Sequence, residues 1–284
     1  MKTIKLLTLS VLIAALFSSC QNEGLNEETA NLEKTPTKDQ LTKLASLGVN
    51  TDNVIIKTIT NLDDTKEDYF LNDTDLSIPV SELSDMESLE TLTDGTKHYR
   101  TRNLISSRNR TIDILGYTGG GGFGLSNTNR QALQRAVNNY NRLNSSLNLR
   151  LSFGTNYQAA DMVVYVRSDL GSGGLAGFPS GGRPYKWVRI GPRVDDLGVG
   201  YSTHVIAHEM GHCIGLRHTD WFARVCDNGA NEGQSSEGAI HIPGTPTGID
   251  YSSIMISCPV PGTNPRNYTG RLVGNDRTAI EYLY

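Results

Sequence analysis

The chain has 284 residues, with 26 Lys and Arg against 30 Asp and Glu and a formal net charge of −4. The basic residues are spread along the sequence, which excludes the charged footprint of a nucleic-acid-binding protein. Beyond residue 20, the chain is long enough for one large or two modest domains and has no segment apolar enough to cross a membrane.

Residues 1–20 are interpreted as a targeting segment that is not part of the fold. A lysine-containing start precedes an apolar run at 6–17, which is too short to span a bilayer. The Phe-Ser-Ser-Cys sequence at 17–20 resembles a bacterial lipoprotein signal, with cleavage before Cys20 and lipid on its thiol. Phe17 replaces the usual aliphatic residue, so ordinary secretory cleavage stays open. We expect an exported protein of the bacterial cell envelope, anchored to the outer membrane or cell surface through Cys20.

Residues 21–105 form an acidic N-terminal region with 17 acidic and 8 basic side chains. Its polar start is interpreted as a tether. The Thr-Lys-Asp-Gln sequence at 37–40 is a capping box and predicts a short helix that ends near residue 48. Short strands are expected at 54–56 and 69–71. The region has few apolar residues, so the sequence does not establish an independent core.

Residues 106–284 carry 13 acidic and 16 basic side chains and begin with an expected strand at 111–115. The glycine run at 119–122 is not a phosphate loop, because no GK[ST] sequence accompanies it. Thr128 and Gln131 form a second capping box. The apolar spacing behind them predicts an amphipathic helix that ends near residue 143.

Three further strands are expected after this helix. Strict apolar alternation over 147–153 predicts a half-buried strand, and the apolar run at 161–166 predicts a buried one. The third is expected at 185–190, after a glycine-rich loop. A helix at about 202–214 follows, and a last helix is expected to be capped by Asp276.

One H-E-x-x-H-x-x-G-x-x-H sequence begins at His208. On a helix, His208 and His212 project from one face and can bind the same ion. Gly215 permits a positive φ, so the chain can turn sharply and bring His218 round as a third ligand. Three imidazoles with an open position for water are a donor set for catalytic zinc. Glu209 is placed beside the first ligand to take a proton from the zinc-bound water.

This extended motif resembles that of the metzincin metallopeptidases. In that group a methionine in a tight turn, the Met-turn, lies under the zinc, and Met255 is the candidate here. The string at 212–221 is similar to the bacterial dual-action HEIGH metallopeptidases, although Met210 stands where that family often has Ile. The resemblance covers roughly the last two thirds of the chain. It implies an α+β, metzincin-like catalytic domain with a twisted mixed β-sheet, a zinc-binding active-site helix, a Met-turn and a C-terminal helix.

The resemblance also implies details of the cleft. The edge strand of the family's sheet pairs with the substrate backbone, and 185–190 is the candidate for it. The loop at 175–179 resembles the matrixin loop but lacks the ligands of its structural zinc, so we expect one catalytic zinc ion only. Some metzincins have a tyrosine two residues after the Met-turn methionine. Ser257 stands there instead, and Tyr251 and Tyr268 are unproven substitutes.

Two residues beside the motif have open roles. His204 lies one turn before His208, and is interpreted as a rim group because the ligand set is already complete. Asp220 either orients His218, contacts Arg217 or is a solvated surface residue.

Three cysteines remain after Cys20. Export to an oxidising compartment makes one disulfide plausible, and Cys226 and Cys258 lie in loop-like stretches that suit it. Cys213 lies inside the expected zinc helix and is interpreted as a small buried hydrophobe. We therefore expect a Cys226–Cys258 disulfide and a free Cys213.

The sequence thus predicts a zinc-dependent endopeptidase with Glu209 as general base. We expect a monomer that acts on peptides or proteins, binds no nucleic acid and meets the membrane through Cys20. An alternative is a surface-anchored binding or adhesion lipoprotein that uses the metzincin fold without turnover, although Glu209 and all three histidines are intact. Hydrolysis of a non-peptide amide also stays open, because the motif fixes the water and not the substrate.

Opposite charges of the two parts favour docking of residues 21–105 onto 106–284. The junction at 98–110 holds four arginines and no acidic residue, and a processing protease would cut such a polar boundary. Residues 21–105 are therefore either a latency segment or a permanent spacer. The region has no cysteine after Cys20, so a latency segment would have to block zinc through Asp94 or His98.

Overall fold

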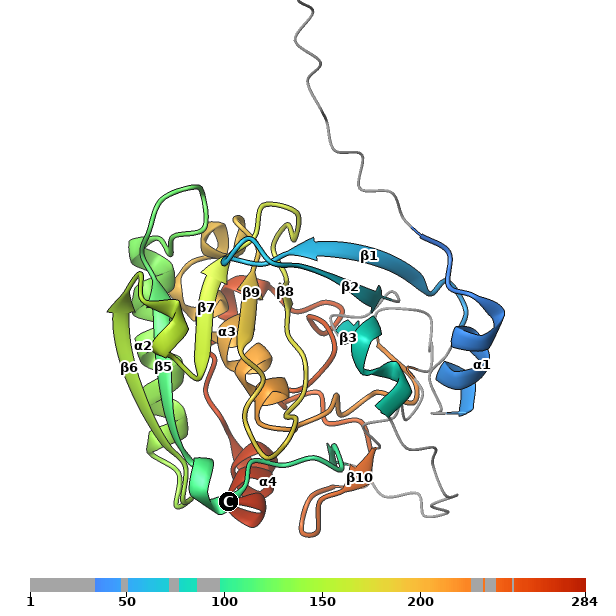
Figure 1. The fold of residues 1–284 in the computed structure, drawn as a ribbon. Coiled ribbons are helices and arrows are strands. Elements are labelled where there is room, and N and C mark those ends of the chain that lie inside the picture. The colour runs from blue at the N-terminus through green and yellow to red at the C-terminus, as the bar shows by residue number, and fades with distance from the viewer. Residues whose placement is uncertain are drawn as a thin grey trace, which may run out of the picture. The chain divides into compact units, whose positions relative to one another are not determined.

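The computed structural model describes residues 34–46, 51–71, 77–85, 98–225, 232, 239–246 and 248–284 (Figure 1). The expected targeting segment with Cys20, the tether, Asp94 and Cys226 lie outside these residues. The segment Leu32–Tyr284 forms one unit by its internal contacts. Among the described residues, no helix combines the length and apolar character needed to cross a bilayer.

The centre of the fold is a five-stranded mixed sheet in the order β6-β5-β7-β9-β8. Its strands are β5 (Thr111–Tyr117), β6 (Asn148–Gly154), β7 (Met162–Val166), β8 (Gly174–Leu175) and β9 (Trp187–Ile190). Four of them run parallel, and β8 pairs antiparallel with β9. Every residue of β7 is buried, because helices cover one face of the sheet and an aromatic cluster covers the other.

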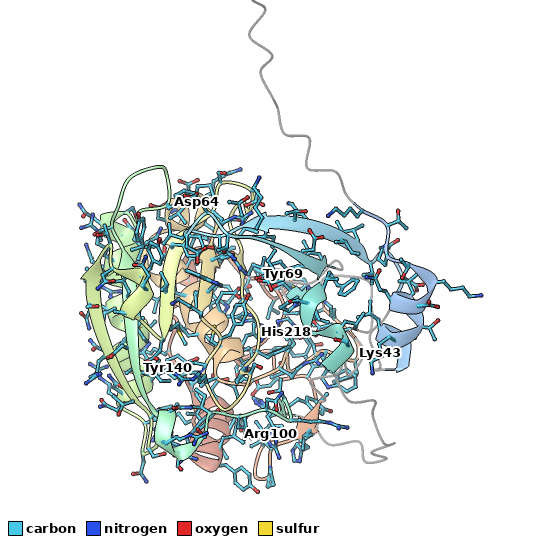
Figure 2. The ribbon with its side chains drawn as sticks, viewed as in Figure 1. Lys43, Asp64, Tyr69, Arg100, Tyr140 and His218 are labelled. Atoms are coloured by element: carbon cyan, nitrogen blue, oxygen red, sulfur yellow. The ribbon has the colours of Figure 1, made fainter. Side chains whose placement is uncertain are left out.

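Two helices, α2 (Asn127–Asn141) and α3 (Val199–Cys213), pack on one face of this sheet and share its main core. The Tyr140 hydroxyl of α2, labelled in Figure 2, donates to the Ala207 carbonyl of α3 at 2.7 Å. The N-cap of α2 lies two residues before Thr128, the residue predicted for it. Ser126 is the N-cap, and its Oγ accepts from the Asn129 N–H at 3.1 Å, so the helix begins before Thr128.

The remaining short elements connect these layers. They are the 3₁₀ helices η1 (Val80–Asp85), η2 (Ser107–Asn109), η3 (Tyr157–Ala159), η4 (Val194–Leu197) and η5 (Pro265–Asn267), the paired strands β4 (Tyr99–Arg100) and β10 (Ile240–His241), and the last helix α4 (Gly274–Leu283).

The N-terminal region has a small core of its own. Helix α1 (Lys38–Ser46) begins at the predicted capping box, in which the Thr37 N–H donates to Gln40 Oε1 at 2.8 Å and the Gln40 N–H to Thr37 Oγ1 at 3.2 Å. Strands β1 (Ile55–Thr60), β2 (Lys66–Leu71) and β3 (Ser77–Pro79) form an antiparallel sheet. Five buried residues join the helix to this sheet: Leu44, Val54, Ile56, Phe70 and Leu83.

This N-terminal sheet packs against the five-stranded sheet, as the course of β1 and β2 in Figure 1 indicates. The junction centres on Arg189 of β9, whose side chain is fully buried. Its guanidinium donates to Asn61 Oδ1 at 2.8 Å and to the Tyr69 hydroxyl at 3.2 Å, both from the N-terminal region. It also donates to the hydroxyls of Tyr165 at 3.1 Å and Tyr185 at 3.3 Å. A buried cation thus depends on polar groups from both parts of the chain.

The expectation that residues 185–190 form the edge of the sheet was wrong. Strand β9 has β7 on one side and β8 on the other, so the edge is the two-residue strand β8. Leu175 of β8 is buried against Ile59 and Tyr69 of the N-terminal sheet. A two-residue strand within a glycine-rich loop has no alternation from which it could be predicted.

The junction at 98–110 is bound closely to the rest of the unit. The Thr101 N–H donates to the Gly215 carbonyl at 2.8 Å, and the Arg217 N–H donates to the Tyr99 carbonyl at 2.9 Å. Ile105 lies in the main core. The proposed boundary therefore runs alongside the turn that follows α3, and the domain division stays a prediction.

Of the cysteines, Cys258 is disulfide-bonded and Cys213 is free and buried. Burial raises the pKa of the Cys213 thiol well above its usual value, so it remains a neutral core side chain. Because Cys226 lies outside the described residues, the Cys226–Cys258 pairing stays a prediction. Peptide mapping without reductant tests it, and a peptide that joins Cys213 to either partner would contradict it.

Candidate metal centre

Helix α3 carries His208 and His212 one turn apart, so both rings leave the same face. The helix ends where Gly215 adopts a φ of 103°, a conformation that residues with a Cβ rarely adopt. The Gly215 N–H then donates to the His212 carbonyl at 2.8 Å and the Leu216 N–H to the Gly211 carbonyl at 2.9 Å. This pair of bonds is a Schellman motif, and the turn that it closes delivers His218 to the other two histidines.

The three imidazoles converge on one point. Each pair of Nε2 atoms of His208, His212 and His218 is separated by 3.1 Å, and all three rings are buried. Within the described ranges, this is the one group of three side chains arranged to hold a metal ion. Zinc bonds to imidazole at about 2.0–2.1 Å, and tetrahedral angles then separate the nitrogens by about 3.3 Å, close to the observed spacing.

The outer nitrogens determine which ring atoms face this point. His208 Nδ1 lies 2.7 Å from the Ile254 carbonyl, and His212 Nδ1 lies 2.9 Å from the Leu216 carbonyl. A carbonyl only accepts, so each Nδ1 carries the proton and each Nε2 presents a lone pair. His218 Nδ1 contacts the Glu232 carboxylate in the same way. Three lone pairs directed at one another need a cation between them, and neutral imidazole suits zinc.

Glu232 is a site residue that the sequence did not indicate. Its carboxylate is buried and also lies 3.4 Å from Arg217 Nη2 and 3.5 Å from Arg224 Nη1. The Glu232 N–H donates to the Trp221 carbonyl at 2.7 Å, which brings a long irregular stretch back to the histidines. Carboxylates that hold a ligating histidine in this way fix its tautomer and strengthen it as a ligand.

Replacement of Glu232 by glutamine is expected to weaken zinc binding by about 10- to 100-fold, because His218 loses its anionic partner. Competition with a chromophoric chelator measures this change. Glu281→Gln is the matched control, since Glu281 lies on α4 and pairs with Arg277. Equal zinc affinity in the two variants would show that Glu232 does not support the site.

The Glu209 side chain extends from α3 to the edge strand β8. Its side chain is almost fully buried, with 2% exposure, and a Cβ added to Gly174 of β8 would collide with its carboxylate. The absence of a side chain at residue 174 therefore lets the edge strand pass directly beside this carboxylate. The Glu209 carboxylate is thus packed against β8, on a residue that directly follows His208 in α3.

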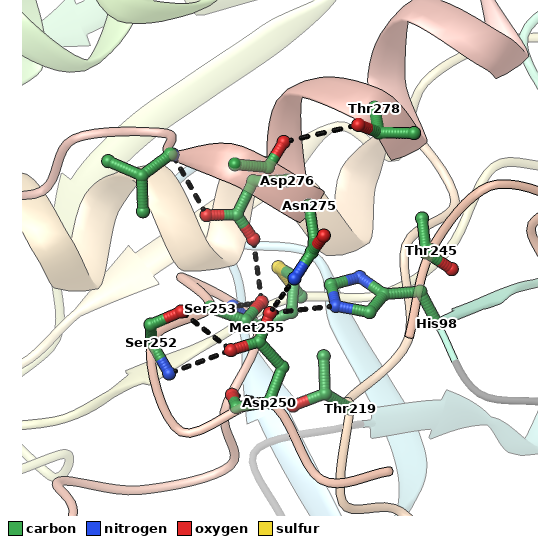
Figure 3. A network of polar contacts seen from close by, with 12 residues as sticks. His98, Thr219, Thr245, Asp250, Ser252, Ser253, Met255, Asn275, Asp276 and Thr278 are labelled. Carbon is green, nitrogen blue, oxygen red and sulfur yellow. Dashed lines mark hydrogen bonds and ion pairs between the residues drawn. The ribbon is translucent and has the colours of Figure 1, made fainter. Parts of the chain in front are cut away.

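Met255 is buried beneath α3, where its sulfur packs against Gly211. Asp276 supports the turn, because its carboxylate accepts from the Ile254 N–H at 3.2 Å and from the Ser253 hydroxyl at 2.6 Å (Figure 3). Asp276 was expected to be the cap of the last helix. It instead lies inside α4 and accepts from the N–H of Val273, the residue before the helix.

Asp220 has a role that none of the sequence alternatives described. It is fully buried, and its carboxylate accepts from the Ser257 N–H at 3.0 Å and the Ser257 hydroxyl at 2.6 Å. The Val225 N–H donates to it as well, at 2.9 Å. Asp220 therefore connects the turn at Met255 to the loop that carries His218.

His98 does not lie where a blocking ligand would. Its Nε2 is 3.3 Å from Asp250 Oδ2, in the network drawn in Figure 3. Asn275 donates to the same oxygen at 2.7 Å, and the Ser252 hydroxyl donates to Asp250 Oδ1 at 2.6 Å. These contacts, that of His98 first, hold the pKa of Asp250 well below its usual value. His98 thus contacts Asp250 and is not one of the three side chains that converge, so its position does not support the alternative in which a latency segment blocks zinc through His98.

A cavity of about 470 Å³ is lined by His204, whose ring centroid is 6.4 Å from that of His208. Its walls include Ile254, Val260 and Tyr268, together with His204, whose ring packs edge-on against Tyr268 at 4.4 Å between centroids. Burial and the nearby His208 lower the pKa of His204 to about 3, so this ring is neutral at physiological pH. His204 is therefore a neutral wall of the cavity.

Comparisons with known proteins add to this geometry. Residues 71–284 match the model of a family described as dual-action HEIGH metallo-peptidase. A structure of myroilysin is similar with a TM-score of 0.39 and 13% identity, over 62% of this chain and 80% of that chain. A second myroilysin structure is similar with a TM-score of 0.36 and 15% identity, over 68% of this chain and 96% of that chain. The curated proteins contain no match.

Proposed function

The chain belongs to the dual-action HEIGH metallopeptidase family, and we propose that it is a zinc-dependent endopeptidase with Glu209 as general base. One observation carries the proposal. Three buried Nε2 atoms converge within 3.1 Å of one another, and Glu209, whose carboxylate is buried, directly follows the first of these histidines on α3. A metallopeptidase needs this combination of an ion and a base at one point.

Held by His208, His212 and His218, zinc would supply a Lewis acid that polarises a carbonyl and activates water. The carboxylate of Glu209 takes the proton from the attacking water and passes it to the leaving amine. Gly174 leaves room for this carboxylate, and burial keeps it out of bulk solvent. An apolar side chain of the peptide next to the scissile bond enters the cavity beside His204.

The test is cleavage of a peptide library by the purified mature protein, with the cuts mapped by mass spectrometry. Cuts with an apolar residue next to the scissile bond are expected, and zinc chelation is expected to stop them. An intact library, with zinc fully loaded, would contradict the proposal. Cuts that show no preference for an apolar residue at that position would contradict the role assigned to the cavity.

We also propose that the protein is exported and lipid-anchored at Cys20. Support comes from the sequence alone, namely the lysine-containing start, the apolar run at 6–17 and the Phe-Ser-Ser-Cys sequence at 17–20. Cells that express the protein are expected to incorporate labelled palmitate into it, and Cys20→Ser is expected to abolish the label. Label in that variant would contradict anchoring at this thiol.

We further propose that the described part of the N-terminal region is a permanent part of the enzyme. Support comes from Arg189, which takes two of its four hydrogen-bond partners from that region, and from Leu175 of β8, which that region buries. Removal of the region would expose a buried cation and an apolar edge strand. Both effects oppose its release.

Trypsin cleavage within residues 98–110 is therefore expected to leave both fragments together on size-exclusion chromatography, with peptide cleavage within about twofold of the intact protein. An Arg189→Gln variant is the control for the junction, and its fragments are expected to separate more readily. A released N-terminal fragment with at least a tenfold rise in rate would identify a latency segment instead.

A further inference from the structure

A second hollow, of about 400 Å³, lies on the other side of Tyr268. One wall is a face of α2, on which Arg135, Asn138 and Arg142 recur at helical spacing. The opposite wall is the segment after η5, which contributes Arg271. The other lining residues are Asn139, Gly200, Tyr268 and Thr269, so the part of the lining that the structure describes has three arginines and no acidic residue.

The segment that carries Arg271 is held firmly in place. Gly200 of α3 has no Cβ, which lets the Tyr268 carbonyl approach the helix closely. Gly270, with a φ of 65°, packs in the same way against Thr203. The Asn139 amide of α2 then donates to the Gly270 carbonyl at 2.8 Å. Arg271 is therefore held opposite the arginines of α2 by contacts to two helices.

Over the ranges that the structure describes, Arg135, Arg142 and Arg271 form no ion pair. Some exposed arginines elsewhere in residues 106–284 do form them, namely those paired with Asp113, Asp196 and Glu281. Like charges gathered around one concavity raise its positive potential, and a planar guanidinium binds a carboxylate through two parallel hydrogen bonds.

The hollow is next to the cavity that His204 lines. Tyr268, Thr269 and Arg271 line both. The ring centroids of His208 and His204 are 6.4 Å apart, and those of His204 and Tyr268 are 4.4 Å apart. Tyr268 is thus at most about 11 Å from His208, which is the length of about three residues of extended peptide.

We propose that this arginine hollow binds a carboxylate of the peptide substrate, from an aspartate or glutamate about three to five residues from the scissile bond. The inference rests on the proposed endopeptidase function and names the substrate class for that site. It assigns to α2 the recognition of acidic peptides, while the cavity beside His204 takes the apolar side chain next to the cut.

The experiment uses matched fluorogenic peptides built on a sequence that the enzyme cuts. One set has glutamates three to five residues from the cut on either side, and the other set has glutamines there. The mature protein is compared with the double variant R135Q/R142Q. The control is R193Q/R277Q, which removes the same charge from exposed positions outside the hollow.

The wild-type protein is expected to favour a glutamate peptide by about tenfold in kcat/KM, and added salt is expected to reduce this preference. R135Q/R142Q is expected to lose the preference and to cleave the glutamine peptide within about twofold of the wild-type rate. R193Q/R277Q is expected to keep the preference. Equal wild-type rates for both sets would overturn the inference, and so would a preference that survives in R135Q/R142Q.

A binding measurement separates this inference from the proposed function. Fluorescence anisotropy of a labelled glutamate peptide on the Glu209→Gln variant reports binding without turnover. If the glutamate peptide binds this variant more tightly than the glutamine peptide, and if adding R135Q/R142Q removes the difference, the hollow is supported even when no peptide is cut. Equal binding of the two peptides would overturn the role assigned to the hollow. If the wild-type protein still cleaved both peptides, the endopeptidase proposal would stand.

Discussion

Glutamine in place of Glu209 is expected to reduce peptide cleavage by at least about 10², with zinc still bound at one ion per chain. Glutamine has nearly the shape of glutamate, so it fits beside Gly174 without a collision, but it cannot accept the proton of the attacking water. The histidines keep their contacts to Ile254, Leu216 and Glu232, so the metal site remains intact. Initial rates and metal analysis on the same preparation measure both effects.

Glu281→Gln serves as the control for loss of one carboxylate, because Glu281 lies on α4 and its exposed partner is Arg277. It is expected to retain full activity. Wild-type rates in the Glu209 variant, with contaminating proteases excluded, would mean that another group is the base.

Alanine in place of His218 is expected to remove zinc and, with it, all measurable cleavage. Two imidazoles hold the ion poorly, and the loss of this ring also leaves the buried Glu232 carboxylate without its histidine partner. Zinc content after dialysis against a metal-free buffer measures the loss. The expected occupancy is far below that of the wild-type protein, which retains its ion under the same treatment.

His204→Ala is the matched control for this change. It removes an imidazole one turn from His208, and its ring forms a wall of the cavity beside the site. Zinc is therefore expected to stay bound, whatever happens to peptide preference. Loss of zinc from His204→Ala and retention in His218→Ala would together mean that the ligand set is wrong.

The parts of the site that sequence could predict are those set by local geometry. The spacing of His208 and His212 fixes their common face on any helix, and Gly215 has the positive φ that the pattern predicted. The buried strand at 161–166 follows from a continuous apolar run, and the structure has it at the centre of the sheet.

The parts that sequence missed depend on where distant segments meet. Glu232 and Asp220 act through contacts to His218 and Ser257, and no periodic pattern relates these positions. The edge of the sheet is likewise a property of the assembled strands. Residues 185–190 have the composition of a strand, but only the fold places β8 outside them.

The outer nitrogens of the three histidines are fixed by Leu216, Ile254 and Glu232, which come from separate segments of the chain. The folded chain therefore presents its ligands already ordered, and an ion binds the folded state far better than the unfolded one. By mass action, free zinc at 1,000 times its dissociation constant stabilises such a fold by about 4 kcal/mol. In a zinc-poor medium the protein would lose this protection together with its reactivity, so metal supply would set its lifetime against unfolding and proteolysis as well as its rate.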